Sequence, residues 1–420
     1  MRFWTKYAPA LPAFFLVFYV TTAAPSESMW RLLPSGIETE IKSVCFSNSS
    51  MGYASGEAGT ILKTTDGGEH WTALESGTGV QLWNIALIPS GGNDMGFAVG
   101  DGGTILKTTD GGATWTKQNS GLKDGLVQSF LFHVFPLDEQ RWFAAGGDGE
   151  AFSGVILSTD NGGQTWVKHH VPGTLFLDRC VFLDAQTGYA VGLNSLNGGS
   201  IFKTVDGGQT WQEQYSSGSI IAGLWCAGPN LCWAVGSTGQ ILHTTDGETW
   251  TAQNAGTTAD LLAVCFSDNQ NGMVCGFDGT ILRTNNGGTT WTDASYELPT
   301  PLNSIQLIDN GATAIAVGRN GTILKMSTLT SVPEELSMPF SVRLLSAAAG
   351  HSTVSVQAPE STIFPVSLSL HTIGGKAIGG RTLYSPAAVF DVGSIPNGTY
   401  LYVVRDASGR VIGRGRIPVE

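Results

Sequence analysis

The sequence predicts an all-β protein, a seven-bladed β-propeller followed by a small β-sandwich. Three observations support this prediction. A short strand phrase recurs seven times at intervals of 40 to 51 residues, and each copy has the same neighbours. The composition also suits short strands joined by tight turns, with 56 glycines, 12 tryptophans and only 13% charged residues.

The composition excludes two classes of protein. Apolar residues make up 42% of the 420 residues, too many for a disordered chain. The net charge of −12 argues against nucleic-acid binding, because phosphates are bound by clustered lysines and arginines. A solvated acidic surface is the simplest interpretation of this charge.

The recurring phrase is GTILKT, which first occurs at residues 59–64. Each copy follows a small-residue strand that ends in glycine, such as GYASG at residues 52–56, and an apolar strand precedes that one. A turn and a fourth strand follow the phrase. Four short strands in each repeat are typical of a propeller blade. The seven copies are marked by Ile61, Ile105, Ile156, Ile201, Ile241, Ile281 and Ile323.

Tryptophans give a second count of the blades. Six of them open the fourth strand of a repeat: Trp71, Trp115, Trp166, Trp211, Trp250 and Trp291. The seventh phrase has no such tryptophan after it, but Trp30 lies 41 residues before Trp71. We therefore expect the N-terminal segment to supply the fourth strand of the last blade, which closes the ring and leaves no open sheet edge.

A turn with a central Asp or Asn joins the third and fourth strands of six blades. A short carboxylate or amide accepts hydrogen bonds from nearby backbone N–H groups, and the glycines that follow allow positive φ. Because the turns are spread around the ring, we expect each of them to hold its own hairpin together, and we do not expect a catalytic or calcium-binding array. The central residues are Asp66, Asp110, Asn161, Asp206, Asp246 and Asn286.

The two ends of the chain differ from the repeats. Arg2 and Lys6 precede an apolar run that is too short to span a bilayer, so residues 1–24 are predicted to be a signal peptide. The propeller is expected over residues 25–329, a linker over 330–339 and the C-terminal domain over 340–420. No later segment is long and apolar enough for a membrane helix, so we expect no transmembrane segment after signal cleavage.

Six cysteines follow the signal peptide, and an exported protein can keep disulfides. Cys226 and Cys232 bracket a short turn and are the first candidates for a pair. Cys265 and Cys275 lie on neighbouring strands and form a second candidate pair. The spacings match no zinc pattern, so no metal or other cofactor is expected.

The turn T-x-[DN]-G-G-x-T-W resembles the Asp-box, or bacterial neuraminidase repeat. Together with the GTILKT and GYAVG strands, it resembles the seven-bladed photosystem II assembly and stability factor family over about residues 29–326. The resemblance implies an interaction scaffold without catalysis. The photosynthetic members are expected to use an arginine-rich patch. Here the propeller's arginines after the first blade are scattered in sequence: Arg141, Arg179, Arg283 and Arg319. An assembly factor for a photosystem or membrane complex is therefore the weaker alternative.

Two phrases near the C-terminus, LSLHTIGGK at 368–376 and IPNGTYLYV at 395–403, resemble a type IX (Por) secretion C-terminal sorting domain. A final basic strand at 410–416 fits the same family, whereas its usual Pro-Asn-Pro opening is absent. The resemblance implies a Bacteroidota-type bacterium and export through the periplasm. The type IX machinery would then deliver the protein to the cell surface or the medium. An ordinary accessory sandwich is the alternative.

Asp-box propellers also include glycoside hydrolases, sialidase-like or glucanase-like, which are the alternative function. A sialidase needs three arginines around its substrate, but the R-I-P motif here lies at 416–418, outside the propeller. A glucanase-like site needs a carboxylate pair across a groove. We expect solvated loop carboxylates and no enzyme. The loop carboxylates between second and third strands are Asp101, Asp148, Glu150 and Asp278.

These loops open on the face opposite the Asp-boxes, together with the connections that lead into each first strand. We expect a surface for a protein or glycan ligand there. The alternative is that its aromatic residues pack between blades. The candidate residues are Trp83, Asp101, Phe132, Phe176, Trp225 and Asp278.

Overall fold

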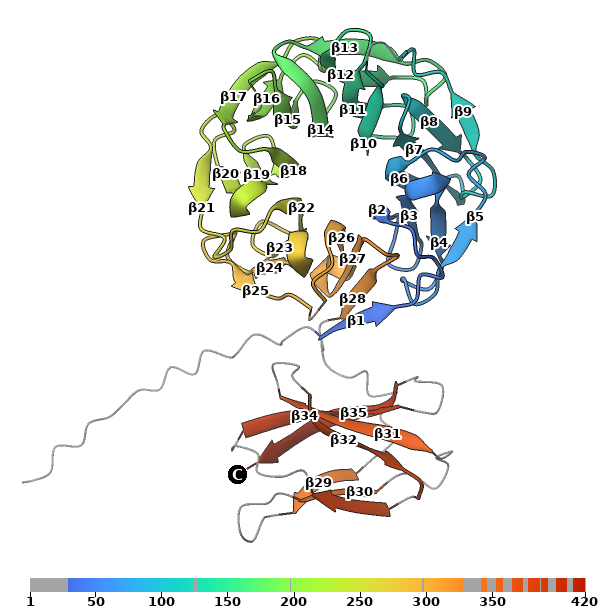
Figure 1. Cartoon of the computed structure of the whole chain (residues 1–420), viewed down its shortest axis with the longest axis vertical. Helices are drawn as coiled ribbons and strands as arrows, with labels where there is room; N and C mark the ends of the chain where they lie inside the picture. The colour runs from blue at the N-terminus through green and yellow to red at the C-terminus, as the bar shows by residue number, and fades with distance from the viewer. Residues whose placement is uncertain are drawn as a thin grey trace, which may run out of the picture. The chain divides into compact units, whose positions relative to one another are not determined.

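The chain folds into two compact units in the computed structural model, and the first spans Ser28–Thr330 (Figure 1). The structure describes residues 29–123, 127–196, 198–296 and 298–327 of this part. Of the C-terminal part it describes 341–345, 353–357, 365–372, 377–385, 387–391, 398–405 and 411–419. The predicted signal peptide and the linker at 330–339 lie outside the described residues. Within the described residues, no helix is long and apolar enough to cross a membrane.

The first unit is a ring of seven four-stranded antiparallel sheets, which confirms the predicted propeller (Figure 1). Blade 1 comprises β2 (Ile41–Phe46), β3 (Gly52–Gly56), β4 (Ile61–Thr64) and β5 (Thr72–Leu74). Blade 2 comprises β6 (Leu82–Ser90), β7 (Asn93–Gly100), β8 (Thr104–Thr108) and β9 (Thr116–Gln118). Blade 3 comprises β10 (Phe130–Pro136), β11 (Trp142–Asp148), β12 (Ser153–Thr159) and β13 (Val167–Val171).

The remaining blades follow the same order from the innermost strand outward. Blade 4 comprises β14 (Thr174–Phe182), β15 (Gly188–Asn194), β16 (Gly199–Thr204) and β17 (Gln212–Ser217). Blade 5 comprises β18 (Ile221–Gly228), β19 (Leu231–Gly236), β20 (Ile241–Thr244) and β21 (Thr251–Gln253). Blade 6 comprises β22 (Leu261–Phe266), β23 (Gly272–Gly276), β24 (Ile281–Thr284) and β25 (Thr292–Asp293). Single 3-10 turns are η1 (Glu57–Gly59), η2 (Ser237–Gly239), η3 (Phe277–Gly279) and η4 (Asp309–Gly311).

Blade 7 is closed by the N-terminal segment, as the tryptophan count predicts. It comprises β26 (Leu302–Ile308), β27 (Thr313–Gly318), β28 (Ile323–Ser327) and, outermost, β1 (Met29–Leu33). Trp30 lies opposite Met326, is buried, and donates from Nε1 to the carbonyl of Ala294 in blade 6 at 2.8 Å. The first and last strands of the propeller therefore share one sheet.

Every innermost strand carries a β-bulge at the same place. In β2, for example, Ile41 pairs with Gly56 and Ser43 with Ser55, so Lys42 is the extra residue. Bulges add twist and redirect a side chain. The equivalent bulged residues are Lys42, Trp83, Phe132, Asp178, Ala222, Leu262 and Asn303.

A glycine of the second strand lies beside the bulge in each blade. A Cβ atom on Gly276 would lie 2.0 Å from the carbonyl oxygen of Asp260, and the other six positions are equally close to backbone. This close approach of two strands explains the glycine that ends each GYASG-like phrase. The seven glycines are Gly56, Gly100, Gly146, Gly192, Gly236, Gly276 and Gly318.

Polar side chains join neighbouring innermost strands beside the bulges. Asn84 in blade 2 donates to Ser43 Oγ of blade 1 at 2.8 Å and accepts from the Val134 N–H of blade 3 at 3.1 Å. Equivalent positions in other blades use different side chains for the same purpose, since buried backbone groups need partners. These are Ser304 with Val44, His133 with Cys180, and Arg179 with Ala222.

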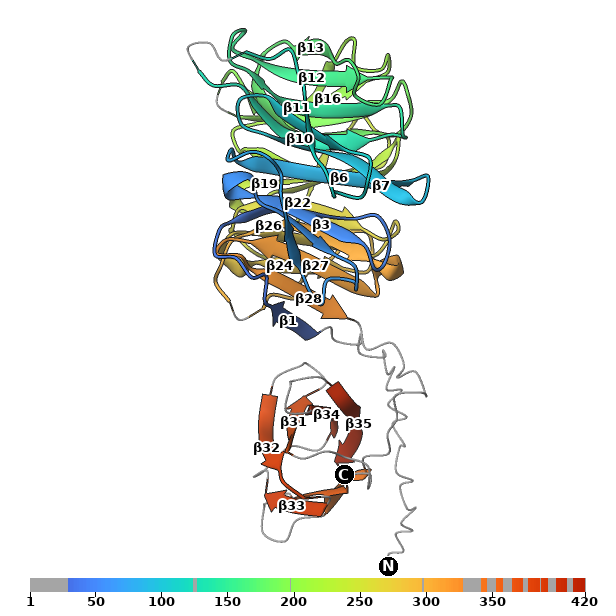
Figure 2. The same cartoon turned by 90° about the vertical axis from the view of Figure 1, so that its right-hand side faces the viewer.

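The second unit contains two antiparallel sheets (Figures 1 and 2). The three-stranded sheet has the order β29 (Ser341–Leu345), β30 (Thr353–Gln357) and β33 (Ala387–Asp391). The four-stranded sheet has the order β32 (Ala377–Leu383), β31 (Val366–Thr372), β34 (Gly398–Arg405) and β35 (Val411–Val419). Two sheets are what a small sandwich requires, and the sandwich itself stays a prediction.

Candidate functional site

The Asp-box turns are self-contained hydrogen-bonded units. In blade 2, Thr108 Oγ1 donates to Asp110 Oδ1 at 2.8 Å and accepts from the Gly112 N–H at 2.9 Å. Asp110 also accepts from the N–H and the hydroxyl of Thr114 at 2.9 and 2.6 Å. Asn161 occupies the equivalent place in blade 3 with its amide. All of these hydrogen bonds to the carboxylate come from groups of the same turn.

The hydrogen bonds from Thr114 lower the pKa of Asp110 to about 2. Because this value lies below that of an unfolded aspartate, about 3.9, the ionised form contributes stability that is lost as the pH falls toward 2. Asp110→Asn does not titrate. We expect the wild type to lose thermal stability relative to Asp110→Asn between about pH 5 and about pH 2, measured by thermal melts. A difference that stays constant over this range contradicts the assigned role.

In four blades the GTILKT-like phrase carries a lysine that links its blade to the Asp-box turn of the next blade. Lys63 Nζ donates to the carbonyl of Gly111 at 2.7 Å, and Lys107 donates to that of Gly162 at 2.6 Å. Lys325 makes the same bond to Gly67 at 2.7 Å, which joins blade 7 to blade 1. The Asp-box face is thus built mainly of structural contacts.

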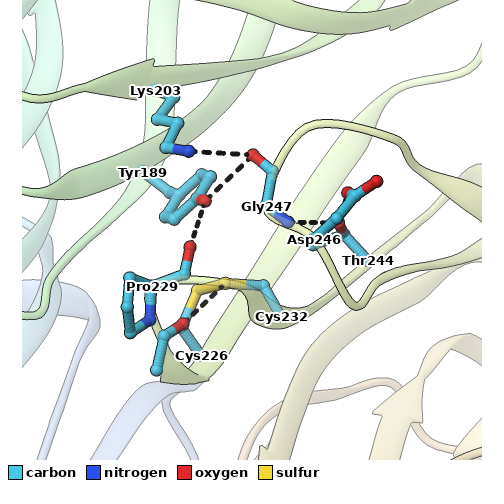
Figure 3. The surroundings of a disulfide bond; sticks show 9 residues. Tyr189, Lys203, Cys226, Pro229, Cys232, Thr244, Asp246 and Gly247 are labelled. Carbon is cyan, nitrogen blue, oxygen red and sulfur yellow. Dashed lines mark hydrogen bonds between the residues drawn. A yellow bond between two sulfur atoms is a disulfide. The ribbon is translucent and has the colours of Figure 1, made fainter.

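A disulfide joins Cys226 and Cys232 across the turn between β18 and β19 (Figure 3). The same turn contacts blade 4, because Tyr189 Oη lies 2.6 Å from the carbonyl oxygen of Pro229. Cys265 and Cys275, the second candidate pair, are free and buried. They do not lie opposite each other, since Cys275 pairs with Ala263 and Cys265 with Met273.

Replacing both Cys226 and Cys232 with serine is expected to cost about 2 kcal/mol, because the short loop loses its cross-link in the unfolded chain. The thermal midpoint of the oxidised wild type should therefore exceed that of the double variant by several degrees. Reductant should remove this difference by lowering only the wild type. An equal response of both proteins to reductant contradicts the prediction.

Four of the six predicted binding residues lie together in blades 2 to 4. Trp83 Nε1 donates to Asp101 Oδ1 at 2.7 Å, and the Trp83 and Phe132 rings lie 5.2 Å apart, edge to face. Phe132 is 5.5 Å from Phe176 and stacks on Phe130 at 5.5 Å. All four rings are partly exposed. We call Trp83, Phe130, Phe132 and Phe176 the aromatic arc.

The other two predicted binding residues lie elsewhere. Trp225 is in the middle of β18, where its ring packs 5.2 Å from Phe266 of blade 6 and 5.7 Å from Trp233. Trp225 therefore packs between blades 5 and 6, as the alternative interpretation of these aromatic residues predicts. Asp278 is exposed in η3 with a φ of 55°, in blade 6.

Asp148 corrects the expectation of solvated loop carboxylates. It is the last residue of β11, and its side chain is 1% exposed. Its Oδ2 lies 3.1 Å from both Lys168 Nζ and His170 Nε2, and its Oδ1 accepts from the Glu150 N–H at 3.1 Å. Asp148 is therefore a buried structural carboxylate that orders its own loop.

We call the surface made by the interblade connections and the loops between second and third strands the connection face. Six of the nine exposed large apolar side chains described in the propeller belong to it. Sequence reasoning missed them, because isolated apolar residues in loops form no period. They are Val127, Phe152, Leu175, Leu196, Ile220 and Phe277, and the first five belong to blades 3 to 5 or lead into them.

The four arginines that follow the first blade lie on different elements. Arg141 pairs with Asp138 in a turn on the Asp-box face, while Arg179 donates to the carbonyl of Ala222 inside the ring. Arg283 lies within β24, and Arg319 is on the connection face. These four arginines therefore lie in different parts of the propeller.

Comparisons with known proteins agree on the propeller. Residues 74–222 match the family model described as Photosynthesis system II assembly factor YCF48. The photosystem II assembly lipoprotein Ycf48 of Parasynechococcus marenigrum (strain WH8102) is 44% identical over 50 residues, 12% of this chain and 15% of that protein's length.

Solved structures show the same fold at low identity. YCF48 from Cyanidioschyzon merolae has a TM-score of 0.56 at 19% identity, covering 71% of this chain and 98% of that chain. A structure described as YCF48 bound to D1 peptide has a TM-score of 0.58 at 17% identity and covers 71% and 97%. The WD40 propeller domain of Doa1 has a TM-score of 0.57 at 12% identity and covers 72% and 97%. The chain thus carries a seven-bladed propeller that is similar, over residues 74–222, to the YCF48 assembly-factor family.

Proposed function

We propose that this chain is a non-catalytic scaffold that binds a segment of another protein on its connection face, outside the cell. The observation that carries the proposal is the uneven distribution of exposed apolar side chains. Leu196 is 88% exposed and Phe152 49%, in adjacent blades of that face. Soluble proteins rarely expose grouped large apolar residues unless the surface binds something.

The aromatic arc supports the same location. It lies on the innermost strands of blades 2 to 4, and the exposed apolar loops belong to blades 3 to 5. Partly exposed aromatic rings are enriched at the centres of protein interfaces. A peptide is the partner we propose, since a propeller of the same fold is described as bound to a D1 peptide.

Selection of peptides on the immobilised full chain tests this function. The probe is a phage-displayed library of linear peptides, and the recovered sequences are then synthesised and measured by fluorescence anisotropy. We expect Phe152→Ser combined with Leu196→Ser to weaken binding at least about tenfold, as loss of interface anchors does.

Val205→Ser is the matched control, because Val205 is 68% exposed but lies within an Asp-box turn. It should leave affinity unchanged. Recovery of no binding peptide, or equal effects of the two changes, contradicts the proposal. Turnover of a chromogenic glycoside that disappears in Asp101→Asn contradicts the non-catalytic part.

We extend the proposal to type IX secretion, on the sorting-domain phrases at 368–376 and 395–403. Residues 340–420 fused to a reporter with a Sec signal should reach the medium or surface of a type IX-competent bacterium. They should stay in the periplasm of a strain without the translocon. Equal export from both strains contradicts this part.

A further inference from the structure

Lys42 shows how the inner ring of bulged residues holds a cation. Its ammonium lies 4.9 Å from the ring centroid of Trp83 and pairs with Glu40 at 2.9 Å. An aromatic face and a carboxylate together stabilise an ammonium group that is partly removed from water. This end of the aromatic arc, at blades 1 and 2, is therefore complete within the chain.

The other end of the arc, at blades 3 and 4, also has aromatic rings and a carboxylate. Asp178 is the bulged residue of β14, the register equivalent of Lys42, Trp83 and Phe132 in the three preceding blades. Phe176, two residues before it, touches Phe132. Aromatic rings and a carboxylate thus follow one another around the inner ring.

The Oδ2 atom of Asp178 has no hydrogen-bond partner among the described residues. This atom has no accessible surface. Arg179, the next residue, donates from Nε to the carbonyl of Ala222 at 3.2 Å. Within the described residues, Arg179 and Asp178 form no ion pair. Burial raises the pKa of Asp178 to about 7, although the charge of Arg179 lowers it. A buried carboxylate oxygen without a hydrogen bond is costly, and carboxylates with a perturbed pKa concentrate at functional sites.

The surrounding face favours a positively charged ligand as well. Carboxylates predominate over cations among its described residues, and several are exposed. A partner with lysine or arginine would meet a complementary potential there, which favours association and correct orientation. The carboxylates of the connection face are Glu38, Glu40, Glu57, Glu75, Asp101, Glu150, Asp260 and Asp278, against Lys42, Lys123 and Arg319.

We propose that the bound peptide segment inserts a lysine or arginine side chain beside Phe132 and Phe176, with Asp178 as its counter-ion. The inference rests on the proposed function and specifies its ligand, a cationic peptide. The partner's cation would repeat at blade 4 the arrangement that Lys42 makes with Trp83 and Glu40 at blades 1 and 2.

A double-mutant cycle tests the inference with the peptides recovered above. Each lysine or arginine of a recovered peptide is exchanged in turn for glutamine, and the affinity of each peptide is measured for the wild-type chain and for Asp178→Asn. One exchange should weaken binding to the wild-type chain by about 10- to 100-fold but weaken binding to Asp178→Asn by less than about twofold, because only a direct pair shows such coupling. Glu150→Gln is the control for an exposed carboxylate of the same face and should preserve the full effect of the peptide exchange.

Folding of the variant is checked independently. Asp178→Asn has the same shape, and its melting midpoint should equal or exceed that of the wild type because an unpaired buried charge is removed. If it falls instead, the carboxylate has a structural role and the inference is overturned. Peptides that need Phe152 and Leu196 but show no coupling to Asp178 overturn the inference and leave the proposed function intact. Failure to recover any peptide for the connection face contradicts the proposed function itself.

Discussion

Deletion of Met29–Leu33 is expected to lower the unfolding midpoint of the propeller by roughly 10 °C. The deletion exposes the outer edge of β28 and removes the buried side chains of Trp30 and Leu33. Burial of two large apolar side chains is worth about 3–6 kcal/mol. For a domain of this size, each kcal/mol shifts the midpoint by roughly 2–4 °C.

The deletion also removes ties between the ends of the ring. Arg31 of β1 contacts Glu69 of blade 1 at 2.6 Å, and Lys325 of β28 contacts the same carboxylate at 2.8 Å. The Trp30 bond to Ala294 ties β1 to blade 6. We therefore expect blades 6, 7 and 1 to lose protection from hydrogen exchange first, ahead of the rest of the ring.

Tryptophan fluorescence is the measurement for this variant, because residues 340–420 contain no tryptophan and the signal reports the propeller. Leu32→Ser is the control, since Leu32 is on the same strand but half exposed, and it should change the midpoint little. An unchanged midpoint after deletion means that β1 does not hold the ring closed.

Gly276→Ala is expected to destabilise the propeller by about 3 kcal/mol, the upper end of the cost of inserting one carbon into a packed site. The added Cβ would lie 2.0 Å from the carbonyl oxygen of Asp260 and 2.9 Å from the Cα of Leu261. Both are backbone atoms, so no side-chain rotation relieves the contact. The bulge at Leu262 must shift, and the paired strands β22 and β23 must separate.

Gly79→Ala is the matched control. Gly79 has ordinary φ, and no heavy atom lies within 4 Å of a Cβ built there. Alanine at such a site is neutral or slightly stabilising, because it restricts the unfolded chain. Urea unfolding followed by tryptophan fluorescence compares the two variants, and equal midpoints contradict the role assigned to the glycine.

The repeat determines most of the fold directly. Each GTILKT-like strand occupies the third position of its blade, and the position of Trp30 is sufficient to predict that β1 closes blade 7. These features can be predicted because strand periodicity and turn chemistry are local and are repeated seven times. The Asp-box turns can be predicted for the same reason, since their hydrogen bonds lie within about four residues.

The binding surface is only partly accessible to such reasoning. Trp83, Asp101, Phe132 and Phe176 are brought together as predicted candidates, whereas Trp225 is in the core. Asp178 was not a candidate at all. Asp178 is the extra residue of a bulge in β14, and a bulge changes which way a side chain points without altering the hydrophobic pattern of the sequence.

The sequence by itself therefore determines the class of fold, the number of blades, the closing strand and the turns that hold each blade. Only the tertiary structure decides which loop residues are exposed together and which carboxylates are buried. Asp148 is satisfied by Lys168 and His170, while Asp178 Oδ2 has no hydrogen-bond partner among the described residues. The physical reason is that turns and strands form from neighbours in sequence, whereas a ring brings together side chains from different blades, and burial depends on that distant packing.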